Sequence, residues 1–188
     1  MRAEVVSFSD EPLILVDSND EEVGFLDKEA CHNGDGKLHR AFSVFIFNSE
    51  GKLLLQQRSS SKRLWGGYWA NTCCSHPRQG ETVAFAALRR LKEEVGLDAS
   101  LKQIFSFEYH ARFKELGSEH ELCHVLLGKT DATPDPNVSE IEALRWVSAD
   151  ELDAELAQED HTLTPWLAIE WKRLRSEFKD ELGNLGVK

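Results

Sequence analysis

Short apolar runs recur along the chain, and residues 104–113 and 121–127 also alternate in the way that is typical of β-strands. A polar turn, Asn48-Ser49-Glu50-Gly51, joins two of these segments and predicts a hairpin. The segments expected to form strands cover residues 13–16, 23–26, 40–47, 53–57, 104–113, 121–127 and 144–147.

Helical spacing replaces this alternation between residues 82 and 95, and Gly96 is a typical helix stop. At one residue per 100°, the carboxylate of Glu94 borders the apolar face, whereas Glu93 points to solvent. The apolar face is expected to consist of Ala84, Ala87, Leu88, Leu91 and Val95.

Two further helices are expected near the end of the chain. Ser148 and Glu151 form a capping box, and Thr164-Pro165 opens a long terminal helix with proline in its first turn. Strands and helices mixed in this order predict an α/β or α+β fold.

Composition agrees with one globular domain. The 188 residues suit a single core, 41% of them are hydrophobic, and no apolar run of about 18 residues predicts a membrane span. We expect one domain over residues 1–188, with terminal extensions at about 1–11 and 174–188. The N-terminus lacks the pattern of a signal peptide, so we expect a cytoplasmic protein in which the four cysteines are free thiols or metal ligands.

A net charge of −11 argues against nucleic acid as a partner. The same charge repels small anions, so a phosphate ligand would need a local basic pocket. Arg58, Lys62 and Arg63 are close enough in sequence to begin such a pocket, although a solvated turn would show the same pattern.

Carboxylates and histidines form the candidate metal ligands. Glu119 and Glu121 share one face of a predicted strand and can converge on one cation, or lie at a solvated strand start. With His32, His39 and His76, they are a plausible nitrogen and oxygen site for a divalent first-row metal. Glu94 can bind a cation too, or can pair with Arg90 on the helix surface.

Cys74 and two aromatic residues are candidates for chemistry on a substrate. A thiol is a workable acid near neutral pH, although most cysteines are small buried hydrophobes. Tyr109 lies on an apolar strand face and Trp166 begins the terminal helix. Aromatic faces stabilise a nearby cation by roughly 0.5–2 kcal/mol, but most such residues form core.

Together these residues resemble type I isopentenyl-diphosphate isomerase, a Nudix-fold enzyme, over about residues 13–171. The most specific part is Asn71-Thr72-Cys73-Cys74-Ser75-His76-Pro77. His32 and His39, Arg58 with Lys62, Trp65-Gly66-Gly67-Tyr68-Trp69, Glu119-x-Glu121 and Thr164-Pro165-Trp166 accompany it.

The helix resembles the Nudix signature with one departure. Glu81, Arg89, Glu93, Glu94 and Gly96 match it, but Ser75 stands where the signature has glycine and Arg90 stands where it has the first helix glutamate. The isomerase family shows the same type of loss, which argues against diphosphate hydrolysis.

The resemblance implies a Nudix-type α/β/α sandwich with a mixed central sheet, and a reaction that interconverts isopentenyl and dimethylallyl diphosphates. It implies Cys74 and Glu121 as the acid and base on opposite faces of the substrate, with Tyr109 assisting Glu121 and Trp166 facing a carbocation-like intermediate. A dry site suits this chemistry, because water would trap the cation as an alcohol.

The remaining implied roles are ligand contacts. His32, His39, His76, Glu119 and Glu121 would hold one divalent metal (Mn²⁺, Zn²⁺ or Mg²⁺), and Glu94 with the backbone carbonyl of Cys74 would hold Mg²⁺ on the diphosphate. Lys28, Arg58, Lys62 and Arg90 would bind the diphosphate oxygens.

Two other functions stay open from the residues alone: a Nudix hydrolase that cleaves a nucleoside or other diphosphate, and a non-catalytic metal-binding module. For the isomerase we expect a small allylic or homoallylic diphosphate as the partner, no nucleic acid, no membrane, and a monomer or small homo-oligomer.

Overall fold

One mixed sheet organises the chain in the computed structural model, which describes residues 2–188. Strands β2, β1, β3, β4 and β5 are neighbours in that order, and the other strands pair with β3, β4 or each other. The strands are β1 (Pro12–Val16), β2 (Glu22–Asp27), β3 (His39–Phe47), β4 (Leu53–Arg58), β5 (Trp69–Ala70), β6 (Cys73–Ser75), β7 (Leu101–Phe113), β8 (Gly117–Lys129) and β9 (Ile141–Val147).

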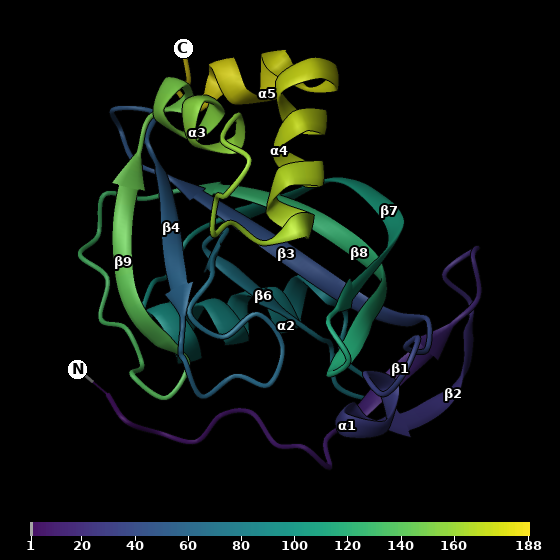
Figure 1. The fold of residues 1–188 in the computed structure, drawn as a ribbon. Coiled ribbons are helices and arrows are strands. Elements are labelled where there is room, and N and C mark those ends of the chain that lie inside the picture. Colours follow the sequence, from purple (N-terminus) through teal and green to yellow (C-terminus); the bar gives the residue numbers. More distant parts are fainter. Residues whose placement is uncertain (1) are drawn as a thin grey trace.

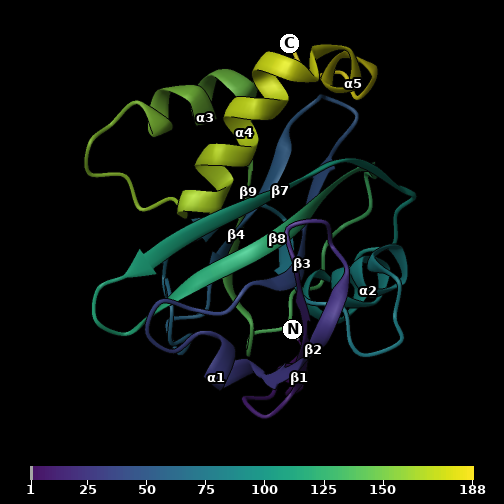
Figure 2. The ribbon, with the colours of Figure 1, turned by 90° about the vertical axis from the view of Figure 1, so that its right-hand side faces the viewer.

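Helices cover both faces of this sheet, as Figures 1 and 2 show. On one side lies α2 (Val83–Arg90), which continues as a π-helical turn (Leu91–Val95). On the other side lie α3 (Ala149–Leu156), α4 (Pro165–Glu177) and α5 (Lys179–Asn184), while the short α1 (Lys28–Cys31) follows β2. The predicted α+β class, with helices on both faces of a mixed central sheet, is confirmed (Figures 1 and 2).

Each helical layer closes a separate apolar core. Phe45, Leu55 and Val125 pack against Leu167 and Trp171 of α4, whereas α2 packs on residues of β3 and β8 that point the other way. Alternation along β3 therefore supplies both cores, and its residues 41–47 are buried throughout. No helix in residues 2–188 is long and apolar enough to cross a membrane.

The expected strands, the hairpin and the capping box of α3 are all present. Four elements were not predicted, namely α1, β5, β6 and α5, because they are short. The expected apolar face of α2 was partly wrong: Ala84 and Leu88 are exposed, and Ala86 is buried instead. Glu93 is only partly exposed, because it forms ion pairs with Arg89 and Arg90 rather than pointing freely to solvent.

The predicted domain boundaries stay predictions. Leu174 and Leu182, in the stretch expected to be a terminal extension, lie in the same core cluster as Phe105. Near the other end, Arg2 forms an isolated bridge with Asn137.

Candidate active site

Strand register assembles the site. Parallel pairing of β3 and β8 sets His39 opposite Glu121, and antiparallel pairing of β7 and β8 sets Tyr109 opposite the same glutamate. On the other side of β3, Cys74 of β6 lies opposite Ser43. Residues from distant parts of the sequence thus meet around one end of β3.

His32 reaches this point because the end of α1 docks on the start of β8. The backbone N–H of Ser118 donates to the His32 carbonyl at 3.0 Å. Gly117 permits the contact: its φ is +145°, and a Cβ there would lie 2.2 Å from that carbonyl oxygen. The glycine therefore allows one metal-ligand candidate to approach the strand that carries two others.

Five predicted ligands form one cluster, consisting of His32, His39, His76, Glu119 and Glu121, whose ligand atoms lie within 4.8 Å of one another. All except the partly exposed His76 are buried. Two ligands on opposite sides of a first-row metal lie about 4 Å apart, so the cluster has the right size for one ion.

Hydrogen bonds fix the orientation of two imidazoles. His32 Nδ1 lies 2.5 Å from the Lys28 carbonyl and His39 Nδ1 lies 2.6 Å from the Lys37 carbonyl. A carbonyl only accepts, so each Nδ1 carries the hydrogen, and in the neutral ring Nε2 presents a lone pair. This arrangement is typical of metal-ligating histidines, whose outer nitrogen is held by a backbone carbonyl.

Several electron-rich atoms then face one another. His39 Nε2 and His76 Nε2 are 3.2 Å apart, and burial holds the pKa of His76 well below its usual range, which favours its neutral form. Glu119 Oε2 lies 2.7 Å from His32 Nε2, yet this buried oxygen makes no hydrogen bond within residues 2–188. Burial opposes a charge on His32, but Glu119 raises its pKa. The donor set fits a divalent cation, which would satisfy all of these atoms.

Glu121 also belongs to the substrate side of the site. Its Oε2 accepts a hydrogen bond of 2.6 Å from the Tyr109 hydroxyl, while its Oε1 faces His76 at 3.1 Å. Burial and the neighbouring Glu121 carboxylate raise the pKa of Tyr109 well above its usual range. Tyr109 is therefore a fixed hydrogen-bond donor.

Cys74 has a defined hydrogen bond of its own. Its Sγ lies 2.7 Å from Asn71 Oδ1, and Asn71 Nδ2 donates to the carbonyls of Val44 and Cys73. The amide is thus locked with its oxygen towards the thiol. Burial raises the pKa of Cys74, so the thiol is protonated at neutral pH.

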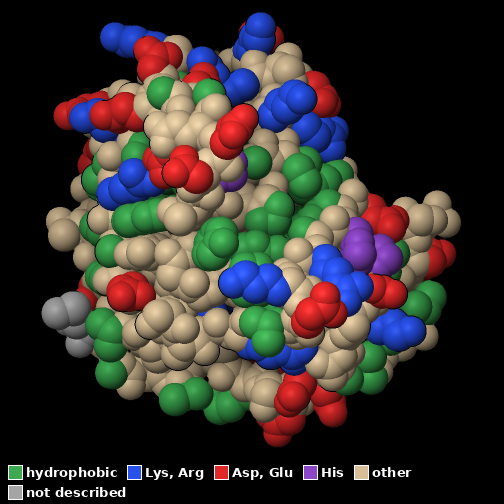
Figure 3. Space-filling view, viewed as in Figure 1, with side chains coloured by type: hydrophobic (Ala, Val, Ile, Leu, Met, Phe, Trp, Pro, Cys, Tyr) green, Lys and Arg blue, Asp and Glu red, His purple; other side chains and the backbone are tan. Residues whose placement is uncertain are grey.

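A cleft of about 430 Å³ connects these groups. Cys74, Tyr109, Glu121 and Trp166 all line it, and Arg58 lies over the Trp166 ring at 5.2 Å from the ring centroid. In Figure 3 hydrophobic side chains meet Lys and Arg side chains near the middle of this face of the molecule. The cleft therefore combines an apolar wall with a basic end.

The basic end contains the predicted phosphate ligands. Lys28, Arg58, Lys62 and Arg90 all line the cleft. Lys62 forms an ion pair with Glu140, which also lies 3.7 Å from Arg90. Burial, reinforced by the charges of Lys62 and Arg90, lowers the pKa of Lys28. An anion bound here would relieve this repulsion between like charges.

Glu94 lies behind the cleft rather than in its wall. Its Oε1 accepts from Arg90 Nη2 at 2.5 Å, both side chains are buried, and Glu94 is absent from the lining residues. The Arg90–Glu94 pair weighed from the sequence exists, but as a buried pair. This arrangement alone does not fit a Mg²⁺ site at Glu94.

Four residues that contact the candidate site residues were not predicted from the sequence: Asn71, Ser43, Glu140 and Glu170. Asn71 lies inside the cysteine motif, and Glu170 follows Trp166 by four residues, so it shares that side of α4. Ser43 and Glu140 have no sequence signal, because only strand register and loop packing bring them to the site.

Fold and site together define a Nudix-domain protein. The NUDIX domain model matches residues 37–167. A Deinococcus radiodurans crystal structure aligns with a TM-score of 0.72 at 26% identity, covering 87% of this chain and 98% of that chain. The MutT protein of Methanosarcina mazei aligns with a TM-score of 0.61 at 21% identity, over 76% of this chain and 96% of the other, and supports the fold alone.

Sequence comparison narrows the family. An isopentenyl-diphosphate Delta-isomerase of Nocardia farcinica is 47% identical over 92% of this chain and 99% of its own length. The isomerase of Serratia proteamaculans is 43% identical over 95% of this chain and 99% of its own length. That of Photorhabdus laumondii is 39% identical over 92% of this chain and 99% of its own length. The chain belongs to the isopentenyl-diphosphate Delta-isomerase family, and the resemblance drawn from the cysteine motif is confirmed.

Proposed function

We propose that this protein interconverts isopentenyl and dimethylallyl diphosphates, moving a carbon–carbon double bond by protonation and deprotonation. Membership of the isomerase family supports the reaction. The observation that carries the assignment to this site is the cleft that Cys74 and Glu121 line together.

In the proposed reaction one group protonates the alkene while the other removes a proton from a different carbon. When the Cys74 thiol acts as the acid, its S–H bond breaks, the electron pair of the double bond forms a C–H bond, and a tertiary cation develops. Glu121 then takes the proton whose loss forms the new double bond. The two groups exchange these roles when the direction of reaction is reversed.

Aromatic side chains suit the intermediate. Trp166 is buried against Trp65, with ring centroids 5.2 Å apart, and Tyr109 lies 6.4 Å from Trp166 between centroids. Their faces stabilise positive charge and keep out water. Tyr109 also holds Glu121 in place through its hydroxyl.

A divalent metal in the His/Glu cluster (His32, His39, His76, Glu119 and Glu121) would offset the negative charge of the two glutamates; Mn²⁺, Zn²⁺ and Mg²⁺ are the candidates. For the diphosphate we propose Lys28, Arg58, Lys62 and Arg90 as ligands. Glu94 and the Cys74 carbonyl would hold substrate-bound Mg²⁺ once Arg90 turns its guanidinium from Glu94 to the phosphate oxygens.

The test is incubation with isopentenyl diphosphate and Mg²⁺ in D₂O, followed by NMR. We expect dimethylallyl diphosphate that carries deuterium and no release of phosphate or pyrophosphate. Release of either anion would instead support the Nudix hydrolase reading.

The matched variants are Cys74→Ala and Cys73→Ala, which remove neighbouring thiols. Loss of an acid–base group lowers turnover by about 10²–10⁴-fold, and we expect this of Cys74→Ala alone. Cys73 is buried in the core beneath α2, so Cys73→Ala should turn over at close to the original rate. Equal rates for the two variants would remove Cys74 from the proposed chemistry.

A further inference from the structure

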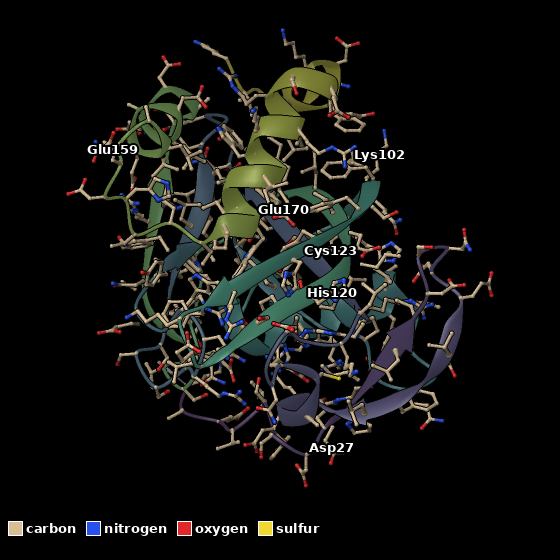
Figure 4. All side chains as sticks on the ribbon, turned by 45° about the vertical axis from the view of Figure 1, so that its right-hand side comes forward. Asp27, Lys102, His120, Cys123, Glu159 and Glu170 are labelled. Carbon is tan, nitrogen blue, oxygen red and sulfur yellow. The ribbon has the colours of Figure 1, made fainter. Side chains whose placement is uncertain are left out.

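Glu170 is a fully buried carboxyl behind the wall of the cleft. It projects from α4 towards β8, and Figure 4 labels it above Cys123. Its exposed fraction is 0%, and no ion pair joins it to any cation in residues 2–188. Its Oε2 is buried without a hydrogen-bond partner in the described chain.

A carboxylate in such surroundings would be costly, because an unpaired buried charge has lost its hydration. The acid avoids this cost by keeping its proton, and burial raises the pKa of Glu170 from 4.5 to about 8. At neutral pH Glu170 is therefore a hydrogen-bond donor.

Ser43 lies between this carboxyl and the thiol of Cys74. It is buried, it lies within hydrogen-bonding reach of Glu170, and its Oγ is 3.7 Å from Cys74 Sγ. Cys123 packs beside both groups, with its Sγ 3.4 Å from Glu170 Oε1 and 3.5 Å from Ser43 Oγ. A chain of polar groups thus runs from α4 through β3 to Cys74.

Once the Cys74 thiol has given its proton to carbon, the sulfur is a thiolate and requires a hydrogen-bond donor. Asn71 Oδ1, which accepts from the thiol, then faces a thiolate and repels it. The amide cannot rotate to present its Nδ2, because two backbone carbonyls hold that group. The positive charge of Arg58 also favours the thiolate, but a hydrogen bond to the sulfur can come from the Ser43 side.

We propose that Glu170 and Ser43 form a donor chain that positions a hydrogen bond on the Cys74 sulfur when the thiol has transferred its proton. Glu170 is a positioning residue, since it acts through Ser43 and does not touch the substrate. The inference rests on the proposed acid–base role of Cys74.

The test compares full-length, metal-loaded Glu170→Met, Glu170→Gln and Ser43→Ala. Methionine fills a similar volume without a donor, whereas glutamine keeps one. Removing a hydrogen bond that is made only in the transition state costs about 10–100-fold in kcat and leaves KM within about twofold. We expect that loss for Glu170→Met and Ser43→Ala, and near-complete rescue by Glu170→Gln.

Glu177→Met is the matched control, because it removes an exposed carboxylate from the end of the same helix. It should leave kcat unchanged. The double variant Ser43→Ala/Glu170→Met should be no slower than Ser43→Ala, since both substitutions interrupt the same hydrogen-bond chain. Unchanged kcat in Glu170→Met, or an equal loss in Glu170→Gln, would overturn the proposal.

An infrared measurement separates this inference from the proposed reaction. A protonated Glu170 gives a carboxylic acid C=O band that disappears in Glu170→Gln and shifts in Ser43→Ala when its hydrogen-bond partner is lost. If the carboxylic acid band is absent, the donor chain is overturned, whether or not the protein has isomerase activity. A present band in a protein without isomerase turnover overturns the proposed function, and the catalytic part of this inference with it.

Discussion

Arg90 occupies a position where a Nudix helix usually has an acid, and its contacts explain how the chain tolerates a buried cation. Its guanidinium bonds to Glu94, to the Val6 carbonyl and to Ser7 Oγ. Burial disfavours the charge, but Glu94 and Glu140 raise the pKa of Arg90. Removing one partner of such a pair leaves an uncompensated charge, at a cost of about 3–5 kcal/mol.

Glu94→Gln tests the proposed second function of this glutamate. Glutamine can still accept from Arg90 but binds a divalent cation weakly, so we expect the Mg²⁺ concentration for half-maximal isomerisation to rise about tenfold, or about 1.4 kcal/mol. A Mg²⁺ titration of initial rates measures this.

The control for that titration is Glu93→Gln, whose carboxylate also pairs with Arg90 but is partly exposed. It should leave the Mg²⁺ requirement unchanged. Superimposable curves for Glu94→Gln and the unmodified protein would remove Glu94 from the diphosphate site.

At the residue scale, a motif was enough to single out residues that the fold brings together. Cys74, His76 and Glu121 were predicted as site residues because their neighbours in the chain are distinctive, and all three line the cleft. Glu170 was not found, because a glutamate on an amphipathic helix is usually solvated. Only the tertiary structure shows that this one is surrounded by Ser43 and Cys123.

The π-helical turn after α2 is the element that the sequence pattern predicts least well. Glu94 and Val95 end the helix, so their carbonyls are free to accept from the backbone N–H groups of Asn137 and Asp135, at 2.7 and 2.9 Å. A helical periodicity predicts a helix here but cannot distinguish a π turn from an α turn, since the buried Leu91 and Val95 suit both. The longer strands were easier, because each is a short apolar or alternating segment bounded by polar turns.

Gly96 ends this turn, and substituting it tests the close packing. Its φ is +75°, and a Cβ would lie 2.6 Å from the Asp135 carbonyl oxygen. We expect Gly96→Ala to lower the free energy of unfolding by about 1–3 kcal/mol, through backbone strain and the clash. Urea unfolding at constant m measures it.

Gly183 of α5 is the matched site, because an added Cβ there meets no atom within 4 Å and its φ is not left-handed. Gly183→Ala should raise the free energy of unfolding by up to about 1 kcal/mol. If Gly96→Ala left the free energy of unfolding unchanged, the loop at 135–137 would have to move away from the added Cβ at little cost.

At the scale of the whole molecule, a bound cation would tie together separate parts of the fold. Its candidate ligands come from the end of α1, from β3, from the segment after β6 and from β8. Ligand binding to the folded state alone stabilises it by about 2.7 kcal/mol at one hundred times the dissociation constant. We expect chelation to lower the melting temperature and Mn²⁺, Zn²⁺ or Mg²⁺, added singly, to restore it.

His39→Ala should abolish this metal-dependent shift in melting temperature. His120→Ala is its control, because His120 lies on the other face of β8 and pairs with Glu108. Melting curves that respond to metal equally in both variants would contradict the proposed ligand set.

Glu170 also sets a pH dependence for the whole fold. Its pKa is about 8 in the folded protein and about 4.5 in the unfolded chain, so the folded state holds the extra proton between these values. Its contribution to stability is therefore full below about pH 4.5 and declines as pH rises towards 8, by at most about 1.4 kcal/mol per unit. Glu170→Gln, which does not titrate, should remove this part of the decline. Urea unfolding of both proteins from pH 5 to 8 gives the comparison. Parallel pH profiles would show that Glu170 is ionised in the folded protein and would contradict the raised pKa.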